Sequence, residues 1–325
     1  MTLLDPHGRR INYLRLSVTD RCNLRCSYCR PPGMDPEPSS GARLSDDELL
    51  FLARAAVGIG IEKIRITGGE PLLRNGIARL LSRLRMLPGL KKLVLTTNGL
   101  LLAEMAGDLR RAGVESLNVS LDSLVPDRFA RITGSRLQPV LEGIEKALEQ
   151  GFPSVKINVV VMRGVNDDEV VRFAALTIGR PLTVRFIEPM PLSGKDCGPG
   201  LTVPGEEILR RVRERYPLTP RERESLGGPA RYYRMEGASG TIGVITPVSC
   251  HFCGDCNRIR VTCEGFAKGC LFSARDVDLK PYLAGRDAEG LMDTLRSVVV
   301  GKPTGHRFLR EGRRGVSVDM SRVGG

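Results

Sequence analysis

Short apolar runs alternate with longer amphipathic stretches along the first two thirds of the chain. Six runs are expected to form strands: Asn12–Val18, Lys63–Thr67, Lys92–Thr96, Ser116–Leu121, Val155–Met162 and Thr183–Ile187. Each is followed by apolar residues at helical spacing, so that one strand–helix unit takes roughly 30 residues. This alternation predicts an α/β fold with a parallel sheet and crossover helices.

The amphipathic stretches carry helix signals. Ser45 is a candidate N-cap, and Glu48 three residues later completes a capping-box pattern. Further helices are expected over Gly76–Met86, Leu101–Ala112, Leu137–Glu149 and Asp167–Ala175. Six units are two short of a closed eight-stranded barrel, so we expect an open partial (β/α)6 TIM-like barrel.

The repeat is lost in the last third of the chain. There, Pro204–Tyr216 is expected to be a helix, and Arg231–Pro247 and Asn257–Thr262 are expected to be hairpin strands around a second cysteine group. We therefore divide the chain into a barrel domain, residues 1–191, and a C-terminal capping segment, residues 192–325.

Chemically unusual residues follow five of the six expected strands. The loops read CNLRCSYC, GGEP, TNG, LDS and EPMP. The carboxyl ends of parallel strands share one rim of a barrel, where active sites form. Any one of these loops could be ordinary turn chemistry. Five at one rim favour an active site.

Composition and charge narrow the class of protein. Of the 325 residues 41% are hydrophobic, which is enough for a core, and no apolar stretch approaches the roughly 20 residues of a membrane span. The N-terminus lacks a signal-peptide pattern, so we expect a cytoplasmic protein. A net charge of +12 fits nucleic acid, a membrane surface or a polyanionic small molecule. Dispersed arginines, 5% aromatics and no Trp argue against RNA, so we expect neither a nucleic-acid nor a membrane partner.

Nine cysteines fall in two groups, with Cys197 between them as an expected free thiol. Short spacings in a chain of this size favour metal over disulfides. Cys22, Cys26 and Cys29 form C-x3-C-x2-C. Three thiolates leave one iron of a [4Fe–4S] cluster open to a small molecule. Structural zinc takes four ligands, and no nearby His or Cys completes this set.

At these cysteines and the rim loops the sequence resembles the radical S-adenosylmethionine (SAM) superfamily. The resemblance implies that the open iron binds the amino and carboxylate groups of SAM, whose reductive cleavage releases a 5′-deoxyadenosyl radical. It places Tyr28 along the adenine. Further SAM contacts are assigned to Gly68, Gly69, Glu70, Ser120 and Met190. The glycines are expected to let the backbone approach the ligand closely.

The second cysteine group, with CNRIR and the terminal Gly324-Gly325, closely resembles the GTP 3′,8-cyclase family of molybdenum cofactor biosynthesis. The resemblance covers nearly the whole chain, including IRITGGEPLLR, KINVVV and RFIEPMP. It implies a second [4Fe–4S] cluster whose open iron receives guanine. The ligands it implies are Cys253, Cys256 and Cys270. Cys250-x2-Cys253-x2-Cys256 also resembles the start of a ferredoxin run, but the next cysteine is too distant, so we treat Cys250 and Cys263 as spectators.

The same resemblance implies GTP as substrate. It places around GTP the residues Arg15, Arg65, Thr96, Lys156, Arg258, Ile259 and Arg260. On a strand, Arg258 and Arg260 face the same way, and we expect them to be catalytic beside the second cluster. The donor fork of arginine suits a triphosphate, and no G-x4-G-K-[ST] loop offers a P-loop instead.

The implied reaction is removal of the 3′ hydrogen of GTP followed by attack of C3′ on C8. The product is (8S)-3′,8-cyclo-7,8-dihydroguanosine 5′-triphosphate. The family also implies a homodimer, an electron donor of flavodoxin or ferredoxin type and a downstream cyclic pyranopterin monophosphate synthase. The Gly-Gly tail is expected to reach into the active site.

Two alternatives stay open at this point. Another radical SAM enzyme with an auxiliary cluster could act on a peptide, and it should then not consume GTP. A basic nucleic-acid-binding protein with a C-terminal zinc module would be colourless and would bind RNA with strong salt dependence.

Overall fold

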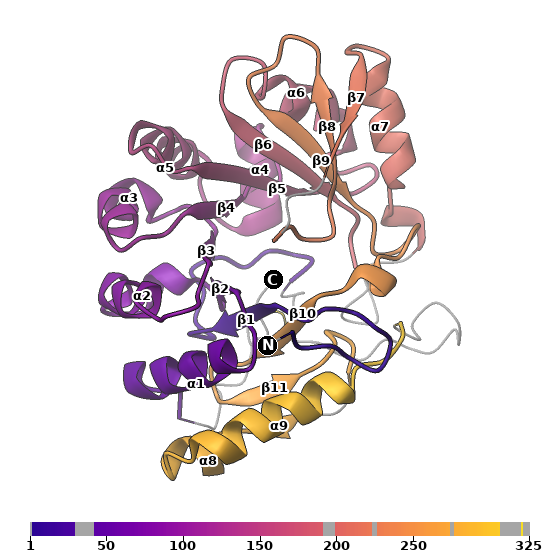
Figure 1. The fold of residues 1–325 in the computed structure, drawn as a ribbon. Coiled ribbons are helices and arrows are strands. Elements are labelled where there is room, and N and C mark those ends of the chain that lie inside the picture. The colour runs from indigo at the N-terminus through magenta and orange to yellow at the C-terminus, as the bar shows by residue number, and fades with distance from the viewer. Residues whose placement is uncertain are drawn as a thin grey trace.

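The computed structural model describes residues 2–29, 42–190, 199–222, 226–273, 276–305 and residue 320. In these residues twelve strands form one sheet, in the order β12-β11-β10-β1-β2-β3-β4-β5-β6-β9-β8-β7. The sheet is strongly curved, and helices α1, α2, α3 and α5 cover its outer face (Figure 1).

The six expected strands are confirmed, with ends shifted by at most two residues. They are β1 (Tyr13–Ser17), β2 (Lys63–Thr67), β3 (Lys92–Thr97), β4 (Ser116–Ser120), β5 (Ser154–Val160) and β6 (Leu182–Ile187). Consecutive members pair in parallel from β1 to β6. The partial barrel expected from the repeat is therefore present.

The expected helices are also present. They are α1 (Asp46–Gly58), α2 (Ile77–Arg85), α3 (Leu102–Arg111), α5 (Gln138–Glu149), α6 (Val170–Ala175) and α7 (Gly205–Arg213). The capping box at the start of α1 is confirmed, because the Ser45 side chain accepts from the Glu48 N–H and the Glu48 side chain accepts from the Ser45 N–H. Helix α4 (Pro126–Thr133) was not expected from the sequence.

The C-terminal segment extends the barrel sheet at both edges. Strand β9 (Thr241–Ile245) pairs in parallel with β6, and β10 (Arg258–Val261) pairs in parallel with β1. Both expected stretches contain hairpin strands: β8 (Arg231–Met235) is antiparallel to β9, and β10 is antiparallel to β11 (Phe266–Lys268), which was not expected from the sequence. Two more short strands, β7 (Leu218–Arg221) and β12 (Val277–Asp278), lie at the sheet edges. With β9 and β10 added, the parallel run has eight strands.

Two further helices follow the sheet, α8 (Lys280–Ala284) and α9 (Ala288–Val300). Helix α9 packs beside α1, at the opposite end of the chain (Figure 1). Leu14 of β1, Ile259 of β10 and Leu295 of α9 all belong to one continuous cluster of buried side chains. The C-terminal segment therefore shares its core with the barrel.

Side chains alternate along each parallel strand between the helices and the interior. On β4, Leu117 and Val119 are fully buried in the hydrophobic core, whereas Asn118 and Ser120 line interior pockets. Successive residues of a strand point to opposite faces, so one apolar face packs against helices and one polar face remains for the interior. This polar face supplies the functional residues.

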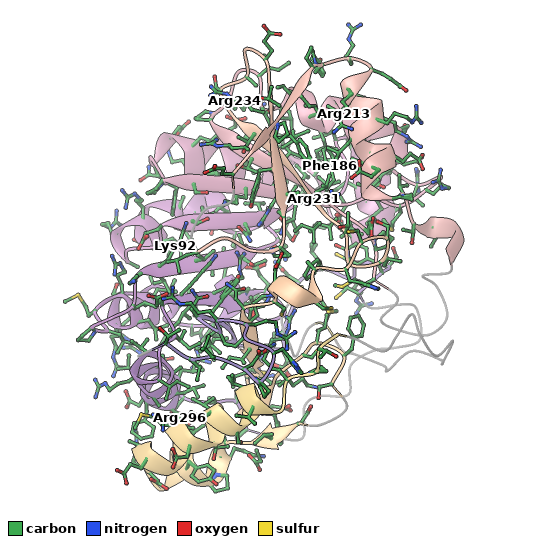
Figure 2. The ribbon with its side chains drawn as sticks, turned by 45° about the vertical axis from the view of Figure 1, so that its right-hand side comes forward. Lys92, Phe186, Arg213, Arg231, Arg234 and Arg296 are labelled. Carbon is green, nitrogen blue, oxygen red and sulfur yellow. The ribbon has the colours of Figure 1, made fainter. Side chains whose placement is uncertain are left out.

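The positive charge is spread over the molecule. Figure 2 shows Lys92, Arg213 and Arg296 on separate elements, far apart in the view, whereas Phe186 lies inside. Within the described ranges no helix is both long and apolar enough to cross a bilayer.

Candidate active site

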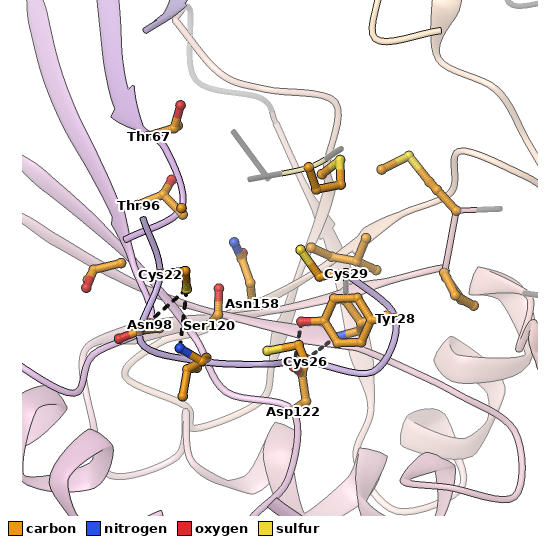
Figure 3. Close-up of a pocket in the computed structure, with 18 of the residues that line it drawn as sticks. Cys22, Cys26, Tyr28, Cys29, Thr67, Thr96, Asn98, Ser120, Asp122 and Asn158 are labelled. Carbon is orange, nitrogen blue, oxygen red and sulfur yellow. Dashed lines mark hydrogen bonds between the residues drawn. The ribbon is translucent and has the colours of Figure 1, made fainter. Parts of the chain in front are cut away.

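The first pocket lies at the carboxyl ends of the barrel strands. It is lined by Cys22, Leu24, Cys26, Tyr28, Cys29, Thr67, Gly68, Gly69, Thr96, Thr97, Asn98, Ser120, Asp122, Asn158, Val160, Ile187, Glu188, Pro189, Met190 and Met320. The structure thus brings together all the residues expected at the SAM site except Glu70. Figure 3 shows Cys22, Cys26 and Cys29 on one loop at this pocket, with Thr67 and Thr96 on neighbouring strands.

The cysteine loop is held by backbone hydrogen bonds to the end of α4. The Arg25 N–H donates to the Thr133 carbonyl and the Ser27 N–H to the Ile132 carbonyl, both at 2.9 Å. These carbonyls belong to the last turn of a helix, where they lack partners within the helix. The unexpected helix α4 therefore fixes the loop that carries the thiols.

The three thiols form a donor set suited to a cluster with one open position. Burial, together with Asp122 and the other two thiols, raises the pKa of Cys26 well above its usual value. A bound cation would reverse this effect, since a coordinating thiol is deprotonated. No three His, Cys, Asp or Glu side chains of the described residues come close enough to hold a single metal ion. Cys22, Cys26 and Cys29 nevertheless all line the first pocket.

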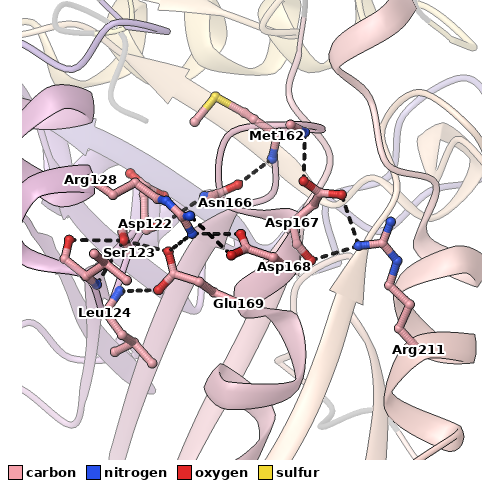
Figure 4. Close-up of polar contacts among 12 residues, drawn as sticks. Asp122, Ser123, Leu124, Arg128, Met162, Asn166, Asp167, Asp168, Glu169 and Arg211 are labelled. Atoms are coloured by element: carbon pink, nitrogen blue, oxygen red, sulfur yellow. Dashed lines mark hydrogen bonds and ion pairs between the residues drawn. The ribbon is translucent and has the colours of Figure 1, made fainter.

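Tyr28 is held in the first pocket by a buried polar network. Its hydroxyl donates to the Asp122 carboxylate at 2.8 Å. Burial raises the pKa of Asp122 to about 6, against the hydrogen bonds from the Val160 N–H and Tyr28, which lower it. The Asn166 amide donates to the Asp122 carbonyl at 2.6 Å, and the neighbouring Glu169 accepts from the Ser123 hydroxyl at 2.6 Å (Figure 4). The network fixes the ring expected to contact adenine.

The glycines of GGEP allow the chain to pack closely on itself, and the close approach of ligand expected of them stays a prediction. A Cβ on Gly68 would lie 2.3 Å from the Thr19 carbonyl oxygen, and one on Gly69 would lie 2.2 Å from that of Arg21. Gly68 also has a φ of 151°, which favours glycine. Both residues line the first pocket, so the close backbone approach brings their loop and the cysteine loop together.

Glu70 is buried and does not line the first pocket. Its carboxylate accepts from the Leu72 N–H at 3.0 Å, the Thr97 hydroxyl at 2.8 Å and the Asn98 N–H at 2.6 Å. It therefore ties the GGEP loop to the end of β3, where the Asn98 amide in turn donates to the Cys22 sulfur at 3.9 Å. The assignment of Glu70 as a SAM contact stays a prediction.

Replacing Glu70 with Gln should change how stability depends on pH. Burial raises the pKa of Glu70 to about 7, despite three hydrogen bonds that lower it, from an ordinary value of 4.5. Because the pKa of Glu70 is higher in the folded than in the unfolded state, the protonated side chain stabilises the fold. This contribution is fully present below pH 4.5 and is lost as the pH rises through about 7. The advantage of the wild-type apoprotein over E70Q in urea unfolding should therefore shrink by up to about 3 kcal/mol between pH 4.5 and 8.

Glu48→Gln provides a control of opposite sign. Hydrogen bonds from Ser45 lower the pKa of Glu48, so its contribution is present at neutral pH and is lost as the pH falls. Equal pH slopes for E70Q and E48Q would contradict the role given to Glu70.

The second pocket lies beside the first, deeper along the strands. It is lined by Tyr13, Arg15, Arg65, Thr96, Asn118, Asn158, Arg185, Ile187, Met190, Gly228, Pro229, Ile245, Pro247, His251, Phe252, Cys253, Cys256, Arg258, Arg260, Gly269, Cys270, Leu271, Phe272 and Met320. The residues that follow β9 and those of β10 face it together, although these strands extend opposite edges of the sheet. No carboxylate is among the described residues that line it.

The electrostatic potential of the second pocket is strongly positive. Burial alone would raise the pKa of Tyr13, but Arg65, Lys63 and Arg15 lower it to about 6. Burial and the charge of Arg258 lower the pKa of Arg260 to about 10. Arginines that repel one another, with no described carboxylate lining the same pocket, favour the binding of an anion there.

Three thiols lie at one end of this positive pocket. Burial acts to raise the pKa of Cys256, but Arg258 and Lys302 outweigh it and lower the pKa to about 7. Cys253, Cys256 and Cys270 line the pocket, whereas Cys250 is exposed and Cys263 is buried elsewhere. Their placement supports the division into ligands and spectators.

Two expected substrate residues lie outside the second pocket. Ile259 is fully buried in the hydrophobic core, because it alternates with Arg258 and Arg260 on β10, and its side chain is therefore not a GTP contact. Lys156 is buried, with its ammonium 5.6 Å from the centre of the Tyr232 ring. Cys197 and Gly324-Gly325 lie outside the described residues.

Several pocket residues were missed in the sequence. Tyr13, Asn118 and Arg185 line the second pocket and were not predicted, whereas Asn98 and Asp122, which line the first, belong to the TNG and LDS loops expected at the rim. The signal was available for the strand residues, because polar side chains within otherwise apolar strands occupy the interior-facing positions.

The two pockets meet at a common set of side chains. Thr96, Asn158, Ile187, Met190 and Met320 line both. The Asn158 side-chain oxygen is buried without a hydrogen-bond partner among the described residues. The two pockets are therefore adjacent along these five shared residues, which we call the seam.

Comparisons with known proteins agree with this arrangement. The family described as Radical SAM superfamily matches residues 16–177, and the family described as Molybdenum Cofactor Synthesis C matches residues 182–308. The structure of Streptococcus suis SuiB bound to precursor peptide SuiA shares the fold, with a TM-score of 0.65 and 14% identity over 97% of this chain and 77% of that chain. The fold and the first pocket define a radical SAM enzyme.

Relatives in sequence show to which family within this class the chain belongs. A GTP 3′,8-cyclase of Geobacter sulfurreducens is 56% identical and covers 100% of both chains. One of Pelotomaculum thermopropionicum is 46% identical over 99% of both chains. Molybdenum cofactor biosynthesis protein 1 of Bos taurus is 42% identical over 94% of this chain and 48% of its own length. The chain belongs to the GTP 3′,8-cyclase family.

Proposed function

We propose that the chain catalyses the SAM-dependent radical cyclisation of GTP to (8S)-3′,8-cyclo-7,8-dihydroguanosine 5′-triphosphate, the first step of molybdenum cofactor biosynthesis. The observation that carries the proposal is the second pocket, where five arginines and three thiols line one space without a described carboxylate. Arginine forks neutralise a triphosphate, and thiolates with an open cluster position can accept a base nitrogen.

The side chains divide the work between the pockets. Cys22, Cys26 and Cys29 would hold a [4Fe–4S] cluster that, with SAM, supplies the 5′-deoxyadenosyl radical. Cys253, Cys256 and Cys270 would hold a second [4Fe–4S] cluster. Arg15, Arg65, Arg185, Arg258 and Arg260 would orient the triphosphate, so that the ribose lies at the seam between the pockets. Enclosure of the seam by Ile187, Met190 and Met320 would exclude water.

The direct test is anaerobic turnover. Protein with both clusters, SAM, GTP and a reductant should yield equal amounts of the cyclic nucleotide and 5′-deoxyadenosine, measured by chromatography and mass spectrometry. Release of 5′-deoxyadenosine with GTP unchanged would reject the substrate assignment.

The alternatives of peptide modification and of nucleic-acid binding are not favoured. The likeness to SuiB shows the fold alone, since its sequence identity is 14%. A zinc-containing nucleic-acid protein would be colourless, whereas protein purified without oxygen should be brown from thiolate-bound iron.

Arg185→Leu should raise the KM for GTP by about 10- to 100-fold, because a charge-assisted hydrogen bond contributes roughly 1.5–3 kcal/mol. Arg185 lines the second pocket and not the first, so the affinity for SAM should stay within twofold. Arg213→Leu, on α7 with its guanidinium over Tyr233, is the matched control. An unchanged KM in R185L would contradict the placement of the triphosphate.

Cys250→Ser should leave the iron content and the cyclisation rate unchanged, because Cys250 is exposed and does not line the second pocket. Substantial loss of iron from this variant would make Cys250 a ligand, and would close the position assigned to guanine.

Further partners complete the proposal. A flavodoxin- or ferredoxin-type donor would supply electrons, and cyclic pyranopterin monophosphate synthase would take the product. A cytoplasmic location fits thiols kept reduced for clusters. The chain would act as a homodimer, with the functional boundary between barrel and capping segment near residue 191.

A further inference from the structure

The segment after α9, residues Gly301–Gly305, lies against the second cysteine group. A Cβ on Gly305 would be 3.7 Å from the Cβ of Cys253. Within this segment Lys302 is only 4% exposed. A buried ammonium is costly unless hydrogen bonds and negative charge compensate it, so its partners indicate its role.

The Lys302 ammonium joins two of the three ligand-bearing segments. Its Nζ donates to the Gly269 carbonyl at 2.6 Å, to the Arg258 carbonyl at 2.8 Å and to the Cys256 sulfur at 3.8 Å. Gly269 directly precedes Cys270. It also gives the lysine room, because a Cβ there would be 3.0 Å from the Lys302 Cγ.

Arg9 holds the third ligand segment against the same region. Its Nη1 donates to the Cys253 carbonyl at 2.8 Å, and its Nη2 donates to the Pro303 carbonyl at 2.7 Å. Asp5 accepts from the Arg9 Nε at 2.6 Å and balances its charge. Arg9 thus has a carboxylate partner of its own.

Lys302 differs from Arg9 in the groups that balance its positive charge. No described carboxylate forms an ion pair with Lys302, and the negative groups that act on it are the thiols of Cys256 and Cys270. A purely structural lysine needs only the two carbonyls. The additional contact with the Cys256 sulfur places the Lys302 ammonium beside thiolates, whose negative charge balances its positive charge.

We propose that Lys302 is a positioning residue for the second iron–sulfur cluster, which fixes the Cys256 and Cys270 segments relative to each other and places a positive charge beside the cluster. The inference rests on the proposed function, which assigns these cysteines to a cluster. Hydrogen bonds to the sulfurs and net charge set cluster reduction potentials. A fixed cation favours the reduced cluster, so Lys302 raises the potential.

The experiment isolates the second cluster in the full chain. Cys22, Cys26 and Cys29 are replaced together by Ala, and Lys302 is then changed to Gln, which keeps a donor but loses the charge, or to Arg, which keeps the charge. Lys280→Gln is the control, because Lys280 lies on α8 with its ammonium over Phe266, outside both pockets. Each protein is reconstituted anaerobically and measured for iron per chain, midpoint potential by paramagnetic-resonance redox titration, and melting by circular dichroism.

The expected result is a more negative midpoint potential in K302Q, with K302R nearer to the Lys302 parent and K280Q unchanged. If K302Q melts early and loses iron, retention of iron in K302R would support the positioning role. A K302Q potential and iron content equal to the parent would overturn the inference, as would equal losses in K302Q and K280Q. A parent that binds no cluster would instead reject the proposed second site, and the role of Lys302 with it.

Discussion

Cys26→Ala is expected to abolish the formation of 5′-deoxyadenosine and of the cyclic nucleotide together, down to the background without protein. Cys26 is one of three thiols on the loop held by α4, and two thiolates do not hold a [4Fe–4S] cluster that leaves only one iron open. Iron per chain should fall by roughly half, because only the second cluster remains.

The measurement is anaerobic assay of 5′-deoxyadenosine with iron analysis of the same sample. Cys263→Ala is a suitable control, because Cys263 is a buried thiol that lines neither pocket. Wild-type amounts of 5′-deoxyadenosine from C26A would refute the assignment of the first cluster.

Cys270→Ala is expected to separate radical formation from cyclisation. It leaves the first pocket intact, so SAM should still bind and be cleaved slowly, while the cyclic nucleotide falls below detection. Loss of the Cys270 thiol removes the cluster that would hold guanine. The ribose is then no longer positioned at the seam for removal of its 3′ hydrogen.

The ratio of cyclic nucleotide to 5′-deoxyadenosine is the quantity to measure, with Cys250→Ser as the matched control. A C270A protein that keeps the wild-type ratio would show that the second cysteine group is not needed to place GTP. Loss of both products in C270A and C250S alike would point to a general folding defect.

The barrel could be predicted from the sequence because its signals are local. Ser45 with Glu48 marks a helix start through contacts three residues apart, and each strand is an apolar run. The pairing of β9 and β10 with opposite edges of the sheet could not be predicted, because periodicity identifies a strand but not its partner. Helix α4, which lies between β4 and β5, and helices α8 and α9, which follow the repeat, were not predicted.

The site was predictable where residue chemistry is unusual and less so where geometry decides. The six cysteines expected as cluster ligands line the pockets, as do Arg15, Arg65, Arg258 and Arg260. Ile259 could have been excluded from the same alternation that puts Arg258 and Arg260 on one face. The close packing of the GGEP glycines could not be predicted from the sequence, because their neighbours Thr19 and Arg21 lie some fifty residues away in the chain.

The alternation of side chains along the barrel strands also sets a spacing between the two pockets. On β4, Asn118 faces the second pocket and Ser120 the first. Two residues of extended chain advance by about 6.6 Å. The spacing between these two pocket-facing positions is therefore set by backbone rise, which a change of side chain leaves unaltered. One inserted residue in β4 would turn Leu117 or Val119 toward the interior and shift one of the two pocket-facing positions. The spacing of these positions therefore depends on the packing of the hydrophobic core.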